Sequence, residues 1–296
     1  MRTTASSAPS VVVAVIGLAA SALAAAPQTP AIDLPTVLTR VGERVADYYR
    51  RAQSIVCTEK VLAQPINSSY SPQGFARALE YELHIESEAA EEDGLIHAAK
   101  IMRELRKVNG HVPKASELGG CFDPESRQEE PLAFLLPNNQ AEYQFTKVGA
   151  GKGKDRNALV VEFVHPLTGE PEFTHNEKKG PDCMSFTLPF TTKGRVFVDP
   201  STFDVLRVEE ELAHHVDLRV PYKVQRGFPN MPDYISIDRH TTTTRYAVVR
   251  FKDPEEALLL PTSIDQLTVG VGGVSHRNSQ QFTDYRRFLT AGRIVK

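Results

Sequence analysis

The residues most suited to acid–base or metal chemistry are a histidine pair and a nearby carboxylate. His214, His215 and Asp217 stand together in a β-rich stretch. Adjacent residues of a strand point to opposite faces, so the two histidines cannot readily bind one ion, whereas His215 and Asp217 share a face. The other histidines are scattered and lack the spacing of a zinc site. The sequence therefore favours a solvated histidine–carboxylate pair, and we assign no metal ligand.

Nucleophilic catalysis has equally little support. The sequence contains no G-x-S-x-G elbow. Cys57 lies in the apolar context "SIVCTE", whereas a reactive thiolate needs an electropositive and partly open setting. The segment "GAGKGK" (149–154) lacks the Ser or Thr of a phosphate-binding loop and is typical of a hairpin turn. We expect a buried Cys57 thiol, no catalytic residue and no cofactor.

Clustered carboxylates leave a hydrolase as one open alternative. Glu80, Glu82 and Glu86 form one group, and Glu209–Glu211 form another. Paired acids could cleave a glycosidic bond. However, the first group alternates with apolar residues in "ALEYELHIE", which is typical of a strand with one solvated face. A hydrolytic site would have to assemble from residues far apart in the sequence.

The N-terminal sequence predicts export. Arg2 precedes an apolar run from Val11 to Ala24, and small residues at Ala22 and Ala24 suit cleavage after residue 24. We therefore divide the chain into a signal peptide (1–24), a Pro- and Ala-rich linker (25–33) and one β-rich domain (34–296). An uncleaved anchor is the weaker alternative, because the run is shorter than the roughly 20 residues of a spanning helix. The expected location is periplasmic or secreted, at most peripheral to a membrane.

Charge and cysteine content agree with an exported protein. The formal net charge is −3, which argues against a nucleic-acid partner, because such a partner requires a basic face. Cys121 and Cys183 lie in loop-like sequences that can adjust to disulfide geometry. We expect a Cys121–Cys183 disulfide in an oxidising compartment. In the chain-entropy model it would stabilise the fold by about 4 kcal/mol.

A single amphipathic helix is expected at residues 34–56. Asp33 can cap it and Pro35 falls in its first turn. Its apolar residues recur at helical spacing, and arginine and acidic side chains form the opposite, charged face. The apolar stripe is short for a coiled coil. The helix should therefore pack on another apolar surface.

Most of the remaining sequence alternates with period two. The sequence predicts roughly ten to twelve strands by this pattern. In the hairpin 194–212, Val196 and Val198 share a face, and so do Leu206 and Val208, which gives the hairpin one apolar side; residues 199–204 form the turn. "LAFLLP" suggests a short helical turn, and the polar stretch 165–181 suggests a loop. The predicted fold is mainly β (α+β): a large curved antiparallel sheet or half-barrel, with the helix on its concave face.

This order of elements resembles a known superfamily. The opening segment "VLTRVGERVADYYRRAQSIVCTEKV", the hairpin "GRVFVDPSTFDVLRVE" and the closing strands "LLLPTSIDQLTV" and "QFTDYRRF" look like the periplasmic lipoprotein-carrier (LolA/LolB-like) superfamily. The resemblance covers most of residues 34–292. It implies an incomplete barrel covered by helices, with acyl chains bound in the gap.

The leading hypothesis is a non-enzymatic exported carrier that binds a lipid or acyl ligand between helix and sheet. A wide sheet has more apolar surface than one helix can cover, so a cavity or a partner must cover the rest. The alternative is a cell-envelope interaction or sensor module that binds another envelope protein at an open sheet edge. The candidate cavity-lining residues are Leu79, Tyr81, Leu83, Ile85, Tyr143, Phe145, Val196 and Val198.

Overall fold

The structure is a computed structural model, and part of the chain is described. The described residues are 32–52, 55–87, 99–117, 132–152, 157–167, 169, 172–175, 184–187, 190–227, 232–252, 255–271 and 275–287. They belong to one unit, Ile32–Lys296. The expected signal peptide, nearly all of the linker, and both Cys121 and Cys183 lie outside these ranges, so those expectations stay predictions.

The N-terminal helix is α1 (Leu34–Arg51). The Asp33 carboxylate accepts a hydrogen bond from the Thr36 N–H at 3.0 Å, which satisfies a free donor of the first turn. The helix ends where the Ala52 N–H donates to the Tyr48 carbonyl. The predicted extension to residue 56 is wrong, because the strand β1 already begins at Ile55. Ile55 and Val56 are β-branched and favour a strand over the end of a helix.

Strands form most of the remaining described chain. The strands are β1 (Ile55–Pro65), β2 (Arg77–Ser87), β3 (Ala99–Val108), β4 (Gln144–Ala150), β5 (Leu159–His165), β6 (Glu172–His175), β7 (Met184–Thr187), β8 (Thr192–Val198), β9 (Val205–Leu212), β10 (Val216–Arg219), β11 (Tyr234–Lys252), β12 (Glu255–Val271) and β13 (His276–Arg287). The short helices are η1 (Ala115–Glu117), η2 (Ala133–Leu135), η3 (Gln140–Glu142) and α2 (Tyr222–Gly227). In the described residues no helix has the length and apolar character needed to cross a membrane.

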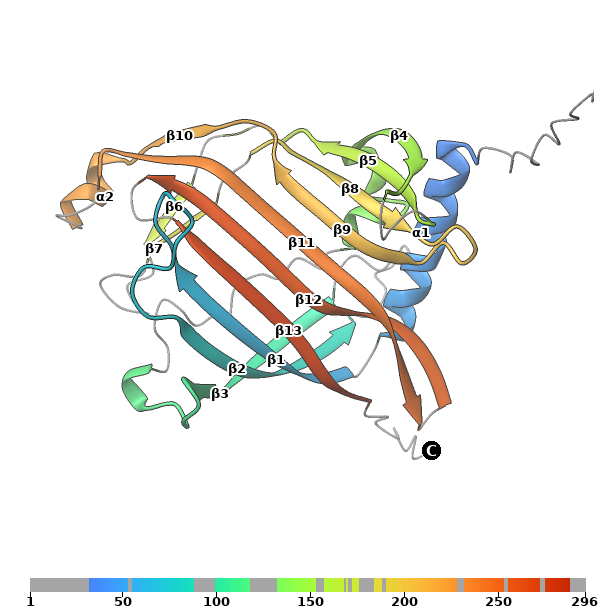
Figure 1. Cartoon of the computed structure of the whole chain (residues 1–296), viewed down its shortest axis with the longest axis horizontal. Helices are drawn as coiled ribbons and strands as arrows, with labels where there is room; N and C mark the ends of the chain where they lie inside the picture. The colour runs from blue at the N-terminus through green and yellow to red at the C-terminus, as the bar shows by residue number, and fades with distance from the viewer. Residues whose placement is uncertain are drawn as a thin grey trace, which may run out of the picture. The chain divides into compact units, whose positions relative to one another are not determined.

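Eleven strands form one antiparallel sheet, shown in Figure 1. Its order is β3-β2-β1-β13-β12-β11-β9-β8-β5-β4, and β10 also pairs with β11. Among the described strands, β3 and β4 end this order without pairing to each other, so the sheet is open. The prediction of a mainly β fold with a large antiparallel sheet and an N-terminal helix is confirmed.

The hairpin 194–212 is formed by β8 and β9. Val196 pairs with Val208, and both side chains are buried on one face, as predicted. A bulge then places Val198 opposite Val205, which is buried, while Leu206 is exposed. The prediction that Leu206 shares the buried face is therefore wrong, because the extra residue of a bulge reverses the alternation.

Two shorter predictions had different outcomes. The helical turn expected at "LAFLLP" is η2. The polar stretch 165–181 was expected to be a loop, but it contains β6, which pairs with β7 in a separate two-stranded sheet. The segment β6 forms a strand because it pairs with β7, and the polar composition of β6 does not indicate that partner.

Candidate ligand-binding site

Helix α1 covers the apolar face of one half of the sheet. Val37, Val41 and Val45 recur at helical spacing and are all buried. They belong to a cluster that also contains Leu132 and Leu135 from the η2 segment. Figure 1 shows α1 beside β4, β5, β8 and β9. The predicted packing of an amphipathic helix on an apolar sheet surface is thus present in this half of the sheet, which we call the helix-covered half.

A close contact fixes the position of α1 against the η2 and η3 segments. A Cβ atom at Gly42 would lie 2.9 Å from the Gln140 amide nitrogen and 3.2 Å from the Leu135 carbonyl oxygen. The Gln140 amide in turn donates to the Leu38 carbonyl at 3.1 Å and to the Leu135 carbonyl at 2.8 Å. The glycine therefore allows the helix backbone to approach a polar bridge that a larger residue would displace.

A hollow of about 160 Å³ lies between α1 and the sheet. Its apolar walls come from α1, the η2 segment and three strands, and the residues that form them are Val45, Tyr48, Leu132, Val205, Val248, Ala257, Leu258 and Leu259. This volume is similar to that of an engineered apolar cavity of about 150 Å³ that binds benzene. The hollow can therefore contain a short hydrocarbon segment, and a whole lipid would have to extend beyond it.

Charged residues surround this hollow. Arg44 of α1 donates to the Asp204 carboxylate at 2.9 and 2.7 Å. Arg51 contacts Asp47 at 3.3 Å and donates to the Ala257 carbonyl at 2.9 Å. An apolar interior with a charged mouth suits an amphiphile whose tail enters and whose head stays near solvent.

The eight predicted lining residues fall into separate places. Ile85, Val196 and Val198 are buried in the cluster beneath α1, and Tyr143 and Phe145 pack against that cluster. Leu79, Tyr81 and Leu83 belong to a second cluster with Cys57, Val108, Ile264 and Phe282. None of the eight lines the hollow beside α1, so as ligand contacts they remain a prediction.

Tyr143 and Phe145 take part in an aromatic group at the β4 edge. Phe134 lies with its ring centre 4.9 Å from that of Phe163, and Tyr143 stacks on His165 at 4.1 Å. The Phe163 ring lies over Gly194 of β8, where an added Cβ would approach it to 2.4 Å. The Phe163 ring therefore fills the space left by the glycine, and the half-buried Tyr143 and Phe145 pack beside it.

A buried ion pair in the second cluster was not expected from the sequence. Glu59 of β1 has 0% exposure, and its Oε1 accepts a hydrogen bond from Arg103 of β3 at 2.9 Å. Burial raises the pKa of Glu59, and Arg103 lowers it. We call the strands β1, β2, β3 and β13 with this cluster the ion-pair half of the sheet. Glu59 lies two residues after the buried Cys57 and therefore shares its face of the strand, a spacing that could have indicated its burial.

Cys57 lies beside this pair and behaves as the sequence predicts. Its thiol is buried, and burial is the main cause that raises its pKa to about 12. The Glu59 carboxylate raises it further. A thiol with such a pKa is almost entirely protonated at neutral pH, so this arrangement does not activate a nucleophile.

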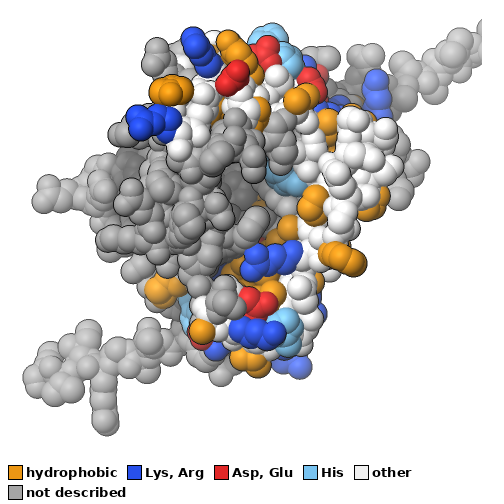
Figure 2. Space-filling model, turned by 90° about the vertical axis from the view of Figure 1, so that its left-hand side faces the viewer, with side chains coloured by type: hydrophobic (Ala, Val, Ile, Leu, Met, Phe, Trp, Pro, Cys, Tyr) orange, Lys and Arg blue, Asp and Glu red, His pale blue; other side chains and the backbone are white. Residues whose placement is uncertain are grey.

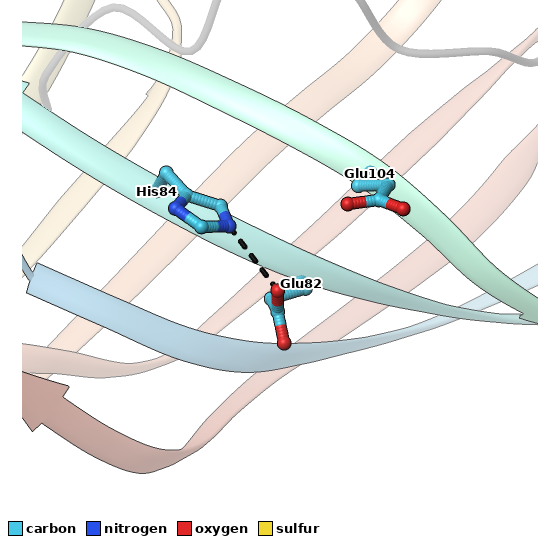
Figure 3. A group of neighbouring side chains, drawn as sticks. All are labelled: Glu82, His84 and Glu104. Atoms are coloured by element: carbon cyan, nitrogen blue, oxygen red, sulfur yellow. Dashed lines mark hydrogen bonds and ion pairs between the residues drawn. The ribbon is translucent and has the colours of Figure 1, made fainter.

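Glu82, His84 and Glu104 form the group of described residues with the geometry closest to a cation site (Figure 3). One potential ligand atom from each lies within 4.8 Å of the others. Arg106, however, binds Glu82 at 2.8 Å and Glu104 at 2.5 Å. This guanidinium, then His84, lowers the pKa of Glu82 by hydrogen bonding. Both carboxylates are therefore already paired with cations of the protein, since Arg286 also contacts Glu82 at 3.4 Å.

The histidine–carboxylate pair singled out in the sequence is also present. His215 contacts Asp217 and Asp238, each at 2.9 Å, and the Ser236 hydroxyl donates to Asp217 at 2.5 Å. All three ionisable side chains are exposed. The Ser236 hydroxyl contacts the carboxylate and not the imidazole. In a serine nucleophile activated by histidine, the hydroxyl would instead donate to the imidazole, so this arrangement is a different one.

Comparison with known proteins gives matches to solved structures. No protein-family model and no curated protein matches the sequence. A LolA superfamily protein from Nitrosomonas europaea is 12% identical, with 88% of this chain and 95% of that chain covered and a TM-score of 0.38. A domain described as an outer membrane lipoprotein-sorting protein from Vibrio parahaemolyticus is 11% identical, with 88% and 94% covered and a TM-score of 0.38.

A third solved structure is a DUF1329 family protein from Desulfovibrio piger. It is 8% identical, with 86% of this chain and 93% of that chain covered and a TM-score of 0.43. All three TM-scores are below 0.5, so the site must be interpreted from its own geometry.

Proposed function

We propose that this chain is an exported, non-enzymatic binding protein that carries an apolar ligand with an acyl chain. The observation that carries the proposal is the hollow of about 160 Å³ between α1 and the sheet. Its apolar walls would exclude water, and transfer of each methylene group into such a site contributes about 0.8 kcal/mol. The charged residues at its mouth would keep a polar head group in solvent.

The position of the site, between a helix and the sheet, would suit the tail of an amphiphile. Tyr48 and Leu258 line the hollow from opposite elements, so a ligand would insert between helix and strand. The volume limits the enclosed part to a short hydrocarbon segment. Arg44 lies at the mouth of the hollow and would supply the positive charge for a carboxylate or phosphate head group. Its present partner is Asp204. Ligand binding would exchange or extend that ion pair.

A binding measurement with matched variants tests this proposal. Ala257 and Ala247 are both exposed alanines on neighbouring strands, but Ala257 alone lines the hollow. Ala257→Phe should fill the entrance and weaken binding of octanoate at least tenfold in calorimetric titration, while Ala247→Phe should bind like the parent. Equal affinity of both variants, or no binding by the parent, would contradict the proposal.

A direct search for a bound ligand complements the titration. The chain purified under native conditions should give a mass above that of the polypeptide, and solvent extraction should release an acyl lipid. Ala257→Phe should reduce this extra mass, and Ala247→Phe should retain it. A parent protein of polypeptide mass alone would favour the alternative of an interaction module.

One observation supports that alternative as a second candidate. Strand β3 ends the strand order of the main sheet, and its exposed Met102 lies beside charged neighbours. A free strand edge can pair with an extended segment of another envelope protein. Introducing proline at Glu104 would remove one backbone donor. Loss of a co-purified protein with retention of octanoate binding would then assign the edge to a partner.

A further inference from the structure

Four loop segments lie together at one end of the main sheet. They are 66–77, 109–117, 219–234 and 271–277, and we call their described residues the loop rim. Each segment follows or precedes at least one of the neighbouring strands β3, β2, β1, β13, β12 and β11. These strand ends lie side by side in the sheet, since the terminal pairs are Val108 with Leu79, Pro65 with His276, and Ser236 with Val271. The rim lies at the left of Figure 1 and faces the viewer in Figure 2.

The loop rim collects the most exposed large apolar side chains of the described residues. The four highest exposed fractions belong to Phe75 (97%), Val112 (78%), Tyr222 (74%) and Val271 (66%). Tyr70 and Tyr234 are also exposed there. Among the side chains whose burial is described, the exposed aromatic rings are Tyr70, Phe75, Tyr222 and Tyr234. Isolated exposed apolar residues are ordinary, but their concentration at one end is not.

Hydrogen bonds connect the rim segments to one another. The Ile66 N–H donates to the Ser275 carbonyl at 3.2 Å, and the Ala78 N–H donates to the Asn109 side chain at 2.9 Å. Within the first loop, Asn67 accepts from the N–H groups of Ser69 and Ser71, each at 3.0 Å. These bonds hold the segments 66–77, 109–117 and 271–277 in position, so binding through them would require little additional ordering.

The rim also differs from the whole chain in charge. The chain has a formal net charge of −3. Lys114, Arg219, Arg226 and Arg277 of the rim are exposed, and Arg77 is partly exposed. The acidic residues of the described rim are Glu117 and Asp233. On the coloured parts of this face, Figure 2 shows blue basic and orange apolar side chains, with some red acidic and pale blue histidine side chains among them.

We propose that the loop rim docks on a membrane surface that contains anionic lipids. Tyrosine and phenylalanine side chains partition well into the interface between head groups and acyl chains. Basic residues near an anionic bilayer strengthen binding through electrostatic attraction. The rim presents both kinds of group on one preorganised edge. This inference rests on the rim alone and not on the proposed ligand site.

Single tryptophan reporters test the orientation of docking. The natural sequence has no tryptophan, so each variant of the full chain carries one defined probe. Phe75→Trp and Tyr222→Trp should shift their emission to shorter wavelength on vesicles of phosphatidylglycerol and phosphatidylcholine, and brominated lipid should quench them. Leu206→Trp, an exposed site at the other end of the sheet, should show neither response. No response from the rim probes, or an equal response from Leu206→Trp, would overturn the proposal.

A charge reversal tests the electrostatic part. Arg226 and Arg250 are both exposed, but Arg250 lies near the opposite end of β11. Arg226→Glu should lower the partition coefficient on anionic vesicles about fivefold or more, and Arg250→Glu should leave it close to the parent value. Equal losses in both variants, or unchanged binding of Arg226→Glu with unchanged Phe75→Trp emission on vesicles, would show that the rim does not direct docking.

Discussion

The two halves of the main sheet have different interiors. In the helix-covered half, α1 brings its own apolar stripe, and Val41 packs with Leu135 and Val196 in one apolar cluster. In the ion-pair half, the interior contains Leu83 and Tyr81 together with the buried Glu59–Arg103 pair. The described residues place no helix over the second half. In the first half, the helix provides the apolar side chains that fill the interior. In the second half, the strands enclose an ion pair.

This difference predicts two kinds of sensitivity. An apolar interior loses stability when volume is removed, because the cavity is only partly refilled. An interior with an ion pair loses most when one partner is removed, because the remaining charge stays desolvated. Replacing both partners by apolar residues has a much smaller cost. The following substitutions separate these two cases.

The largest effect is expected from Arg103→Met. It leaves the Glu59 carboxylate buried without its cation, at a cost of about 4 kcal/mol in the free energy of unfolding. Urea denaturation measures this value. The double variant Glu59→Leu/Arg103→Met should recover most of the loss. Arg106→Met, on an exposed position of the same strand, should destabilise the protein far less than Arg103→Met, because solvent screens an exposed ion pair. Equal costs for the two single arginine variants would mean that the buried pair has no special role.

Leu135→Ala should have the next largest effect. This residue of η2 is buried beneath α1, and the cavity should cost about 3 kcal/mol. Leu206→Ala provides the control, because Leu206 is exposed and its truncation should change stability by less than about 0.5 kcal/mol. A loss below about 1 kcal/mol at Leu135 would contradict tight packing in the helix-covered half.

Gly42→Ala tests the close approach of α1. In an ordinary helix this change stabilises by about 1 kcal/mol. Here the new Cβ would displace the Gln140 amide, so we expect a net destabilisation of about 1 kcal/mol. Gly149→Ala is the comparison, since no atom lies within 4 Å of its added Cβ. Thermal unfolding of both variants gives the sign, and a stabilised Gly42→Ala would refute the contact.

The pKa values of two histidines should be shifted in opposite directions. The pKa of His215 is raised, first by its hydrogen bond to Asp217 and then by Asp238, so its contribution to stability is present at low pH and lost as pH rises through the raised pKa. Burial, and then the charge of His276, lowers the pKa of His240. Its contribution is present at high pH and lost as pH falls through the lowered pKa. Two-dimensional NMR titration should give a higher pKa for His215 than for His240, and the reverse order would contradict both environments.

The smallest change concerns the cysteines. In the native protein the Cys57 thiol should not react with iodoacetamide near neutral pH, because burial raises its pKa to about 12. After unfolding without reduction, intact mass should reveal one alkylated thiol if Cys121 and Cys183 form the expected disulfide. Three alkylated thiols would exclude that disulfide.

The predictions from sequence succeeded where a pattern is local. Period-two alternation in "ALEYELHIE" indicated strand β2, and the spacing of Val37, Val41 and Val45 indicated α1. They failed where one residue changes the register, as at Leu206 in the β8–β9 bulge. The end of α1 was also misplaced, because Ile55 continues the helical spacing by chance. Local patterns do not record which neighbour a residue pairs with.

The sequence by itself determined the amphipathic helix, the strand-rich composition and the buried character of Cys57, because each follows from residue types a few positions apart. Tertiary structure alone decided that Glu59 meets Arg103 across β2, that the hollow forms between Tyr48 and Leu258, and that Phe75 and Tyr222 lie at one end of the sheet. These contacts join residues distant in the chain. Their geometry depends on strand order and register, which are set by the packing of the whole sheet.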